Sequence, residues 1–453
     1  MKTWLLCAVA LLTAASAPAQ VPGAPALTLD ECLRAALGRS PELEAQRYEL
    51  SASKDAIWKA QSALFPQLTG DLLTQTLNGS STSPFNVLSL ADADVGSTGR
   101  AGQRRVRANF DSVGAFSVRL SYGLFENGSI MGLNDAPAVA AARMARTRQE
   151  WTYRLSEQDV EYRLTLAFYQ AVSDQSQFDM AKRKVLLSKE RLEIIKQELQ
   201  VELKLPKDVD LAQAQLAADQ QATVSWQNHT WESLARLNAL IGRSQAPSTR
   251  LDLSEPRTPS VPDLQALIGT AIRSHPAVGV QKAKIDTARE DLRLARSQML
   301  PSVKLESGFT EATDYQRANT DLFVIGVSVN VPIFDFGHGK AATSESKNKM
   351  LAEQARLGQV EDNVRDALIS AVGALHRTES KLADLLRDSI AAKNKQTLAE
   401  TQRELGMIDQ LALVDAQLES LTVMQSLDLQ KLAQRFEFAA LQYATGDLWK
   451  WQR

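Results

Sequence analysis

The two halves of this chain repeat the same landmarks in the same order, and this duplication constrains the fold more than any other feature. Pro41 and Pro276 lie 235 residues apart, and Pro66 and Pro301 keep the same spacing. A long repeat of this kind indicates one structural unit that is used twice, so it has to be interpreted before any single residue.

Two later landmarks recur at shorter offsets. Phe125-Glu126-Asn127-Gly128 matches Phe334-Asp335-Phe336-Gly337 at an offset of 209, and Ala214-Gln215-Leu216 matches Ala416-Gln417-Leu418 at 202. The decrease of the offset from 235 to 209 places 26 extra residues in the first copy, in the loop from Asn78 to Ser112. The decrease of the offset from 209 to 202 predicts that the first long helix is seven residues, or one heptad, longer than the second.

Length and charge limit the fold and the partners. A chain of 453 residues could hold about three average domains, but the duplication favours two copies of a unit of roughly 200 residues. The 51 basic and 53 acidic side chains give a formal charge of −2. This balance gives no reason to expect nucleic acid as a partner.

The first residues read as a signal peptide, predicted at 1–19. Lys2 supplies the positive charge, Leu5 to Leu12 form a short apolar run, and Ala17-Pro18-Ala19 is a small-x-small cleavage site. The run is too short to span a bilayer, and no later stretch has about 20 apolar residues. The protein is therefore expected to leave the cytoplasm without a transmembrane helix.

The chain has two cysteines. Cys7 is removed with the signal peptide, which leaves Cys32 alone and excludes an intramolecular disulfide. Two interpretations of Cys32 are open, a reactive thiol or a small buried residue on the first helix.

Each copy is predicted to contain helices, two strands, a long helix and a returning helix. Thr28 and Glu31 form a capping box, Ser40 caps a second helix with Pro41 at its first position, and Pro66 stops that helix. The predicted division is a signal peptide at 1–19, a first repeat at 20–242, a Pro-rich connector at 243–262, a second repeat at 263–446 and a tail at 447–453. Strands are expected at about 66–78, 112–125, 301–312 and 321–334, and long helices at about 130–203, 207–242, 338–405 and 408–445.

The strands are identified by alternation. Phe116, Val118 and Leu120 alternate with Ser117 and Arg119. In the second copy the apolar residues of one parity are Phe323, Ile325, Val327, Val329, Val331 and Ile333. Alternation over about ten residues is typical of a transmembrane β-strand, but a half-buried strand of a soluble sheet alternates in the same way. Both interpretations are open on this pattern alone.

The predicted long helices reach about 100 Å, more than a compact globular domain needs. In the second of them a heptad seam with small and polar members is formed by Val364, Leu368, Ala371, Leu375, Thr378, Leu382 and Leu385. Sharp turns at 204–208 and 406–409 lead into the returning helices, which end at Gly242 and Gly446.

Four strands per chain cannot close a barrel, and an open sheet edge cannot face lipid. If these strands enter a membrane, several copies must share one barrel. Two copies would give eight strands and three would give twelve. Because an eight-stranded barrel is filled by its own side chains, a duct needs more than eight.

These landmarks are similar to those of a known family. They comprise Ser40-Pro41, the helix-ending Pro66 and Pro301, the strand exit at 332–337, and the turn that runs from Gly406 to Ala416-Gln417. In this order and duplicated, they resemble TolC-type outer-membrane efflux proteins over nearly the whole mature chain. The resemblance implies an α+β membrane protein, a homotrimer whose 12-stranded β-barrel in outer-membrane lipid continues into a long periplasmic α-helical barrel. It also implies a passive duct served by a periplasmic adaptor (membrane fusion protein) and an inner-membrane transporter.

The resemblance points to candidate aperture residues. The family often narrows its periplasmic tip with aspartates just after the second turn, and Asp415 falls on one such position. The place three residues earlier is Ala412, which puts a double acidic ring in doubt and leaves Asp409 as a substitute. As an aperture, a ring of three such aspartates would attract cations. In the alternative interpretation, each is an ordinary solvated aspartate near the start of a helix, where the helix dipole favours it.

Adaptor contact is implied for the residues of the two turns. The candidates are Leu203, Lys204, Leu205, Gly406, Met407 and Ile408. Exposed apolar side chains at a helical tip are suited to docking, and the alternative is that they pack against one another inside the bundle.

No catalytic, metal or cofactor site is predicted, so the protein is not expected to be an enzyme. The four histidines are scattered without metal-ligand spacing, and no phosphate-binding glycine loop is present. The predicted function is an exit duct of the outer membrane, with a periplasmic extension, for a tripartite efflux or type I secretion system. The alternative is a soluble periplasmic coiled-coil adaptor.

Overall fold

The computed structural model describes residues 27–76, 112–126, 128–131, 136–243, 251–252, 263–314 and 319–446. The predicted signal peptide at 1–19, the tail at 447–453, nearly all of the loop from Asn78 to Ser112 and most of the connector at 243–262 lie outside these residues. The chain divides into two compact units. The first contains Met1–Gln46, Arg154–Pro276 and Glu361–Arg453, and the second contains Arg47–Tyr153 and Ala277–Val360.

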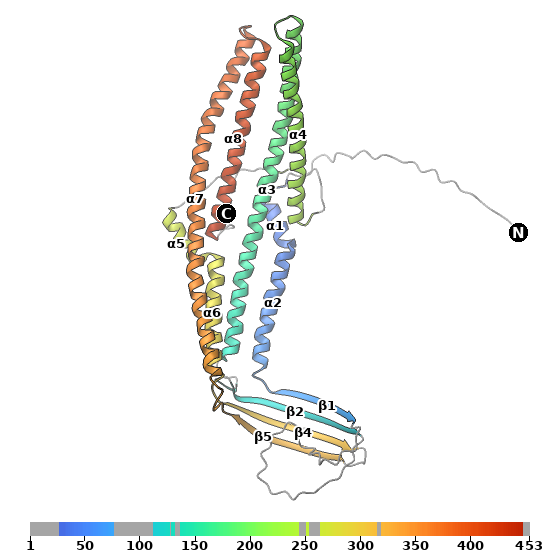
Figure 1. Ribbon diagram of the computed structural model, residues 1–453, viewed down its shortest axis with the longest axis vertical. Coiled ribbons are helices and arrows are strands. Elements are labelled where there is room, and N and C mark those ends of the chain that lie inside the picture. Colours follow the sequence, from blue (N-terminus) through green and yellow to red (C-terminus); the bar gives the residue numbers. More distant parts are fainter. Residues whose placement is uncertain are drawn as a thin grey trace, which may run out of the picture. The chain divides into compact units, whose positions relative to one another are not determined.

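Apart from the short strand β3, the order of elements is the same in both halves of the chain (Figure 1). The first half contains α1 (Leu29–Arg39), α2 (Pro41–Ser62), β1 (Gln67–Thr76), β2 (Ser112–Glu126), the short β3 (Ser129–Ile130), α3 (Pro137–Gln200) and α4 (Pro206–Leu240). The second half contains α5 (Leu264–Ser274), α6 (Pro276–Ser297), β4 (Ser302–Asp314), β5 (Asn319–Asn330), α7 (His338–Glu404) and α8 (Gln410–Thr445).

Local sequence signals set the starts of these elements. The Thr28 side chain accepts a hydrogen bond from the Glu31 amide, and the Glu31 carboxylate accepts one from the Thr28 amide, so the predicted capping box is confirmed. Pro41 and Pro276 occupy the first positions of α2 and α6. A proline is favoured there because the first helical amide has no partner within the helix.

The prediction that the first long helix is a heptad longer is wrong. The helix α3 has 64 residues and α7 has 67. The additional residues of the first copy precede Pro137, where β3 pairs with the end of β2. The strand β5 ends at Asn330, before Pro332, which has no amide hydrogen to donate to a sheet.

The second unit contains one antiparallel sheet with the strand order β1-β2-β4-β5 (Figure 1). The register joins the two halves of the chain through β2 and β4, for example Val118 opposite Phe309. Among the described strands, β1 pairs only with β2, and β5 pairs only with β4. Both outer strands therefore present an unpaired row of backbone amides and carbonyls.

The two faces of this sheet differ in chemistry. Directly paired residues share a face, and Leu68 is paired with Leu120, Leu72 with Phe116 and Phe309 with Phe323. The other exposed apolar residues on this face of β5 are Ile325, Val327 and Val329. The opposite face carries Thr69, Ser117, Arg119, Glu306 and Thr310. The sheet thus has an apolar face exposed to its surroundings and a polar face behind it.

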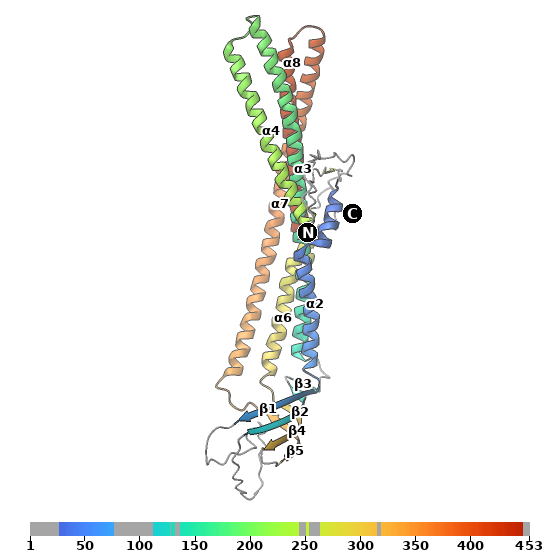
Figure 2. The same cartoon turned by 90° about the vertical axis from the view of Figure 1, so that its right-hand side faces the viewer.

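The first unit contains two helical hairpins, α3 with α4 and α7 with α8 (Figure 2). The helix α1 covers the base of the first hairpin, where its residues Cys32 and Leu33 pack with Leu164, Phe168 and Leu237. Cys32 is fully buried, and burial raises the pKa of its thiol to about 12. This confirms that Cys32 is a small core residue, since a reactive cysteine needs an exposed thiolate.

A close helix contact in the second unit gives a test of the packing. A Cβ added at Gly279 of α6 would lie 2.4 Å from the Trp151 ring of α3, whereas Gly269 of α5 faces open space. We predict that Gly279→Ala destabilises the protein by about 2 kcal/mol, because the indole cannot yield without moving a helix. The control Gly269→Ala should be neutral or stabilising by up to about 1 kcal/mol, since alanine favours helices.

Thermal unfolding of the purified protein, followed by circular dichroism, measures both effects. Equal unfolding temperatures for the two variants would contradict the proposed contact.

Candidate functional site at the hairpin turns

The two hairpins turn with the same backbone geometry. At the end of α3 the Leu203 amide donates to the Glu198 carbonyl at 2.8 Å, and at the end of α7 the Met407 amide donates to Gln402 at 2.8 Å. In each turn the preceding residue is left-handed, Glu202 with φ of 59° and Gly406 with φ of 71°. This is the Schellman arrangement, which normally uses glycine. Gly406 is therefore a conformational requirement of the second turn, and Glu202 is strained by about 1 kcal/mol.

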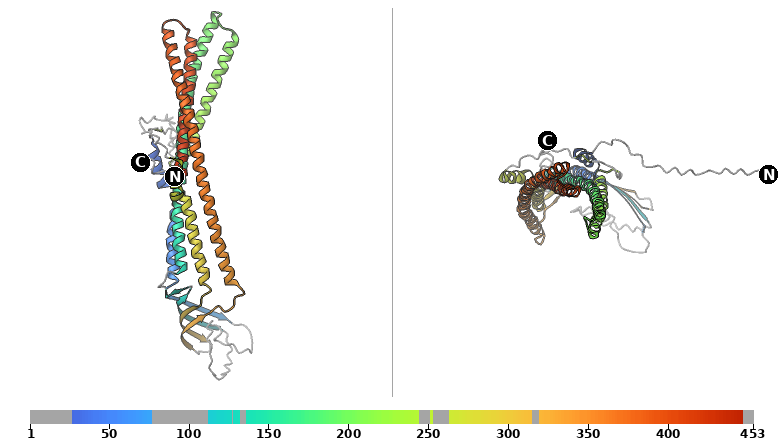
Figure 3. Two further views of the ribbon diagram at one scale, coloured as in Figure 1. Left: turned by 90° about the vertical axis from the view of Figure 1, so that its left-hand side faces the viewer. Right: turned by 90° about the horizontal axis from the view of Figure 1, so that it is seen from above.

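Apolar side chains at both turns are exposed in the single chain. The exposed fractions are 73% for Leu203, 55% for Leu205 and 70% for Met407. Ile408 is half-buried, and the Lys204 ammonium lies 4.0 Å from the Glu198 carboxylate. Figures 2 and 3 show the two turns standing apart. Within one chain, then, the turn residues do not bury one another.

Both candidate aspartates have partners. Asp409 caps α8, and its carboxylate accepts a hydrogen bond from the Ala412 amide at 2.8 Å. The Asp415 carboxylate accepts one from Arg191 Nε of α3, also at 2.8 Å. The structure therefore ties the start of α8 to the other hairpin through an ion pair at Asp415, which sequence analysis did not identify.

The Arg191–Asp415 pair is one of several polar contacts between α3 and α8, and Gln410 at the start of α8 also donates to the Glu190 carboxylate of α3 at 3.0 Å. Below it, Gln425 of α8 donates to the side chain of Gln177 on α3. Further down, the Tyr443 hydroxyl donates to the Asp159 carboxylate at 2.6 Å. We call this line of contacts the α3–α8 seam. Because it joins residues more than 200 positions apart, no local sequence pattern could have indicated it.

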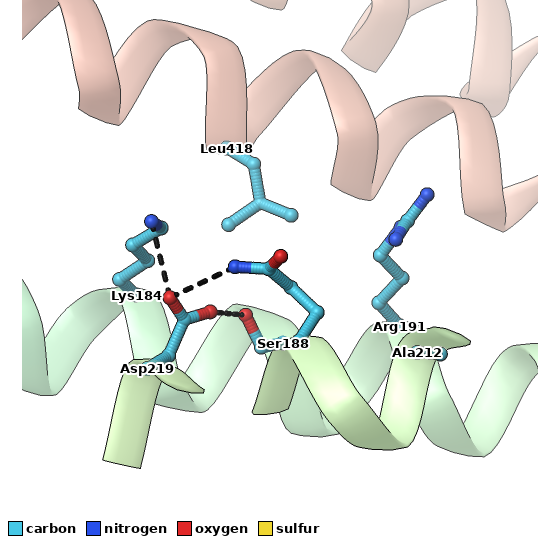
Figure 4. A pocket seen from close by; sticks show the side chains of 7 residues that line it. Lys184, Ser188, Arg191, Ala212, Asp219 and Leu418 are labelled. Carbon is cyan, nitrogen blue, oxygen red and sulfur yellow. Dashed lines mark hydrogen bonds and ion pairs between the residues drawn. The ribbon is translucent and has the colours of Figure 1, made fainter. Parts of the chain in front are cut away.

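A small cavity of about 200 Å³ lies beside the seam (Figure 4). Its lining residues are Lys184, Ser188, Arg191, Ala212, Gln215, Asp219 and Leu418. The buried Asp219 carboxylate accepts hydrogen bonds from Ser188 at 2.6 Å and Gln215 at 3.1 Å, and it forms an ion pair with Lys184 at 3.1 Å. Because Ser188, Gln215 and Lys184 all bind the Asp219 carboxylate, we interpret this cluster as a structural link between α3 and α4.

Two buried titratable groups lie elsewhere in the first unit. Burial, with a smaller effect from Glu157, raises the pKa of Glu161 to about 7. Burial also lowers the pKa of His275 at the end of α5, which favours its neutral ring. Among the described residues, no group of three His, Cys, Asp or Glu side chains is placed to hold a metal ion. In the same residues, none of the helices combines the length and the apolar character that a membrane span requires.

Comparison with known proteins shows which family this chain resembles. A profile of the family described as "Outer membrane efflux protein" matches residues 267–447. The outer membrane protein TolC of Vibrio cholerae is 22% identical over 403 residues, which cover 86% of this chain and 83% of TolC. The chain belongs to the TolC-type outer-membrane efflux family. A further member, the efflux protein BepC of Brucella suis, is 24% identical over 63% of this chain and 61% of its own length.

Solved structures agree on the fold. The Campylobacter jejuni CmeC outer membrane channel superposes with a TM-score of 0.75 at 13% identity, covering 93% of this chain and 87% of CmeC. The outer-membrane channel OprN gives 0.71 at 18% identity, covering 94% and 91%. Together with the family profile and the TolC and BepC relatives, the comparisons support an efflux channel of the outer membrane with a periplasmic extension, and the soluble adaptor is not favoured. The predicted family and location are confirmed, and so is the predicted function as far as an outer-membrane efflux channel.

Glu161 gives a pH-dependent test of the first unit. Its folded pKa of about 7 lies above the usual 4.5, so the folded protein favours the neutral acid. The resulting destabilisation is absent below pH 4.5, grows between pH 4.5 and 7, and is complete above pH 7. We predict that Glu161→Gln stabilises the protein by roughly 2 kcal/mol at pH 8 and by nothing measurable at pH 4.5.

Unfolding temperatures at the two pH values check this result. The control Glu193→Gln, an exposed acid paired with Lys196, should change stability little at either pH. A Glu161→Gln effect of equal size at both pH values would rule out titration as its cause.

Proposed function

We propose that three copies of the chain close one 12-stranded barrel and one helical tunnel, and so form a passive exit duct. The observation that carries this proposal is the pair of unpaired strands at the edges of the sheet, β1 and β5. Their apolar face suits lipid, but their open backbone groups do not. Pairing β1 of one copy with β5 of the next satisfies those groups and closes the barrel.

Strand direction is compatible with this closure. Three antiparallel pairings separate β1 from β5, so the two outer strands run in opposite directions. A junction between β5 and β1 of the next copy is therefore antiparallel, as in all other pairs of the sheet. Two copies would give only eight strands, whose interior is filled by side chains, whereas twelve leave room for a channel.

The helices of the first unit also expose apolar side chains that a neighbouring copy could cover. The seam joins α3 to α8, which leaves α4 and α7 on either side of it. Exposed apolar residues are Leu211, Val224 and Trp231 on α4, and Leu386, Ile390 and Leu398 on α7. Val224 and Trp231 lie seven residues apart and share one face of α4, and Leu386 and Ile390 lie four apart on α7. Such spacings suit the packing of α4 in one copy against α7 in the next.

The turns are the proposed docking surface for a periplasmic adaptor, which couples the duct to an inner-membrane transporter. Leu203, Leu205 and Met407 supply exposed apolar area, and Lys204, Gly406 and Ile408 complete the surface. Asp415 and Asp409 are the proposed aperture residues. Because Arg191 balances the charge of Asp415, opening the aperture requires this ion pair to part or to move as a unit.

Cysteine crosslinking tests the shared barrel. One cysteine replaces Thr69 on β1, and a second replaces Val324, Gly326 or Ser328 on β5 in turn. We predict that one of these registers gives covalent dimers and trimers in outer membranes, because the two strands become neighbours across the junction. Disulfides require Cα atoms within about 7 Å, so the wrong registers should react poorly.

The matched control is a cysteine pair at Ser121 and Glu306, which face each other on β2 and β4 of one chain. It should crosslink only within the chain. Species larger than trimers, or no crosslink between copies in any register, would contradict the proposal.

Photo-crosslinking tests the docking surface. A photoreactive amino acid at Leu203 or Met407 should capture a periplasmic protein that is anchored in the inner membrane, since both side chains are exposed at the turns. The control position is Leu186, which is similarly exposed but lies below the turn on α3. Identification is by mass spectrometry. Capture of the same adaptor from Leu186, or of none from the turns, would contradict docking at the tip.

A further inference from the structure

The polar face of the sheet carries charged side chains at successive levels. Asp71 of β1 lies opposite Ser117, Arg119 of β2 lies opposite Gly308, and Glu306 of β4 lies opposite Ser121. On β2 the three levels are therefore marked by residues 117, 119 and 121, each two positions from the next. The charges along the sheet run acidic, basic and acidic.

Glycines lie directly beside several of these charged side chains. Arg119 is paired with Gly308, Glu306 with Gly326, and Lys304 with Gly123. A Cβ added at Gly326 would meet nothing within 4 Å, and one at Gly308 would meet only the Val118 carbonyl, at 3.7 Å. Arg119 and Glu306 therefore have free space over the neighbouring strand, where they can lie along the wall instead of projecting from it, whereas the Glu126 side chain already covers Gly123.

The spacing of the levels allows the charges to offset one another. Two residues along a strand span about 6.8 Å, and neighbouring strands lie about 4.8 Å apart. Arg119 is thus within about one Debye length of both acidic levels at physiological salt, roughly 8 Å. Lys304, two residues before Glu306 on β4, forms an ion pair with Glu126 at 3.2 Å, so its charge is offset within the chain.

We propose that Asp71, Arg119 and Glu306 set the ion selectivity of the barrel by lining it with alternating, nearly balanced rings of charge. The inference rests on the proposed barrel, in which the polar face becomes the channel wall and each residue occurs once per copy. Arg119 holds the acidic levels close to balance, so the barrel admits solutes of either charge and excludes neither sign. This lining fits a range of cargo that includes both cationic and anionic molecules.

The test is the zero-current potential of the purified full-length channel in a planar bilayer under a KCl gradient. At low salt, Arg119→Gln should raise the ratio of potassium to chloride permeability at least roughly twofold, because it leaves two acidic rings unopposed. Asp71→Asn should shift the ratio in the opposite direction. Both shifts should shrink near 1 M KCl, where the screening length is about 3 Å.

Two controls separate this inference from others. Ser117→Thr changes the same wall without changing its charge and should leave the potential as it is, and Asp415→Asn reports the contribution of the hairpin turns. Conducting channels whose potential is unchanged by both Arg119→Gln and Asp71→Asn, or changed only by Asp415→Asn, would overturn the inference and leave the duct intact. A wild-type protein that forms no channel would overturn the proposed function itself.

Discussion

Unsatisfied backbone hydrogen bonding at the edges of a sheet with an apolar face is the constraint on which the remaining architecture depends. Water can satisfy open edges in a soluble protein, but lipid cannot, and each unsatisfied group costs several kcal/mol there. The outer strands β1 and β5 each offer such an edge, on a sheet whose exposed face carries Leu72, Phe323 and Ile325. A single chain with this sheet is incomplete in a membrane, and identical neighbours supply what is missing.

Within one chain, the two copies of the repeat are joined by different means in the two units. In the second unit β2 and β4 form the join, with a continuous antiparallel register. In the first unit α3 and α8 form the join, through the polar contacts of the α3–α8 seam and through an apolar cluster in which Leu411 packs with Leu192 and Ile195. Net contributions of such polar contacts are modest, about 1 kcal/mol each, whereas their geometry is specific. The polar contacts therefore fix the register of the hairpins, while the apolar cluster contributes buried area.

Sequence analysis identified the elements that local chemistry controls. Prolines at 41 and 276 start helices, the capping box at Thr28 starts another, and alternation in β5 indicates its apolar face. It failed where spacing alone was used, since the seven-residue offset lies before α3 and not within it. It also missed Arg191 and the cluster around Asp219, because contacts between distant helices leave no local pattern. The roles of Asp409, Asp415 and the turn residues are still predictions.

Backbone hydrogen exchange of the lipid-embedded protein tests the shared barrel most directly. If neighbouring copies complete the sheet, amides throughout β1 and β5 exchange as slowly as those of the central strands β2 and β4. If one chain stands alone, alternate amides along the outer strands exchange rapidly while β2 and β4 stay protected, and the account of a shared barrel is then wrong.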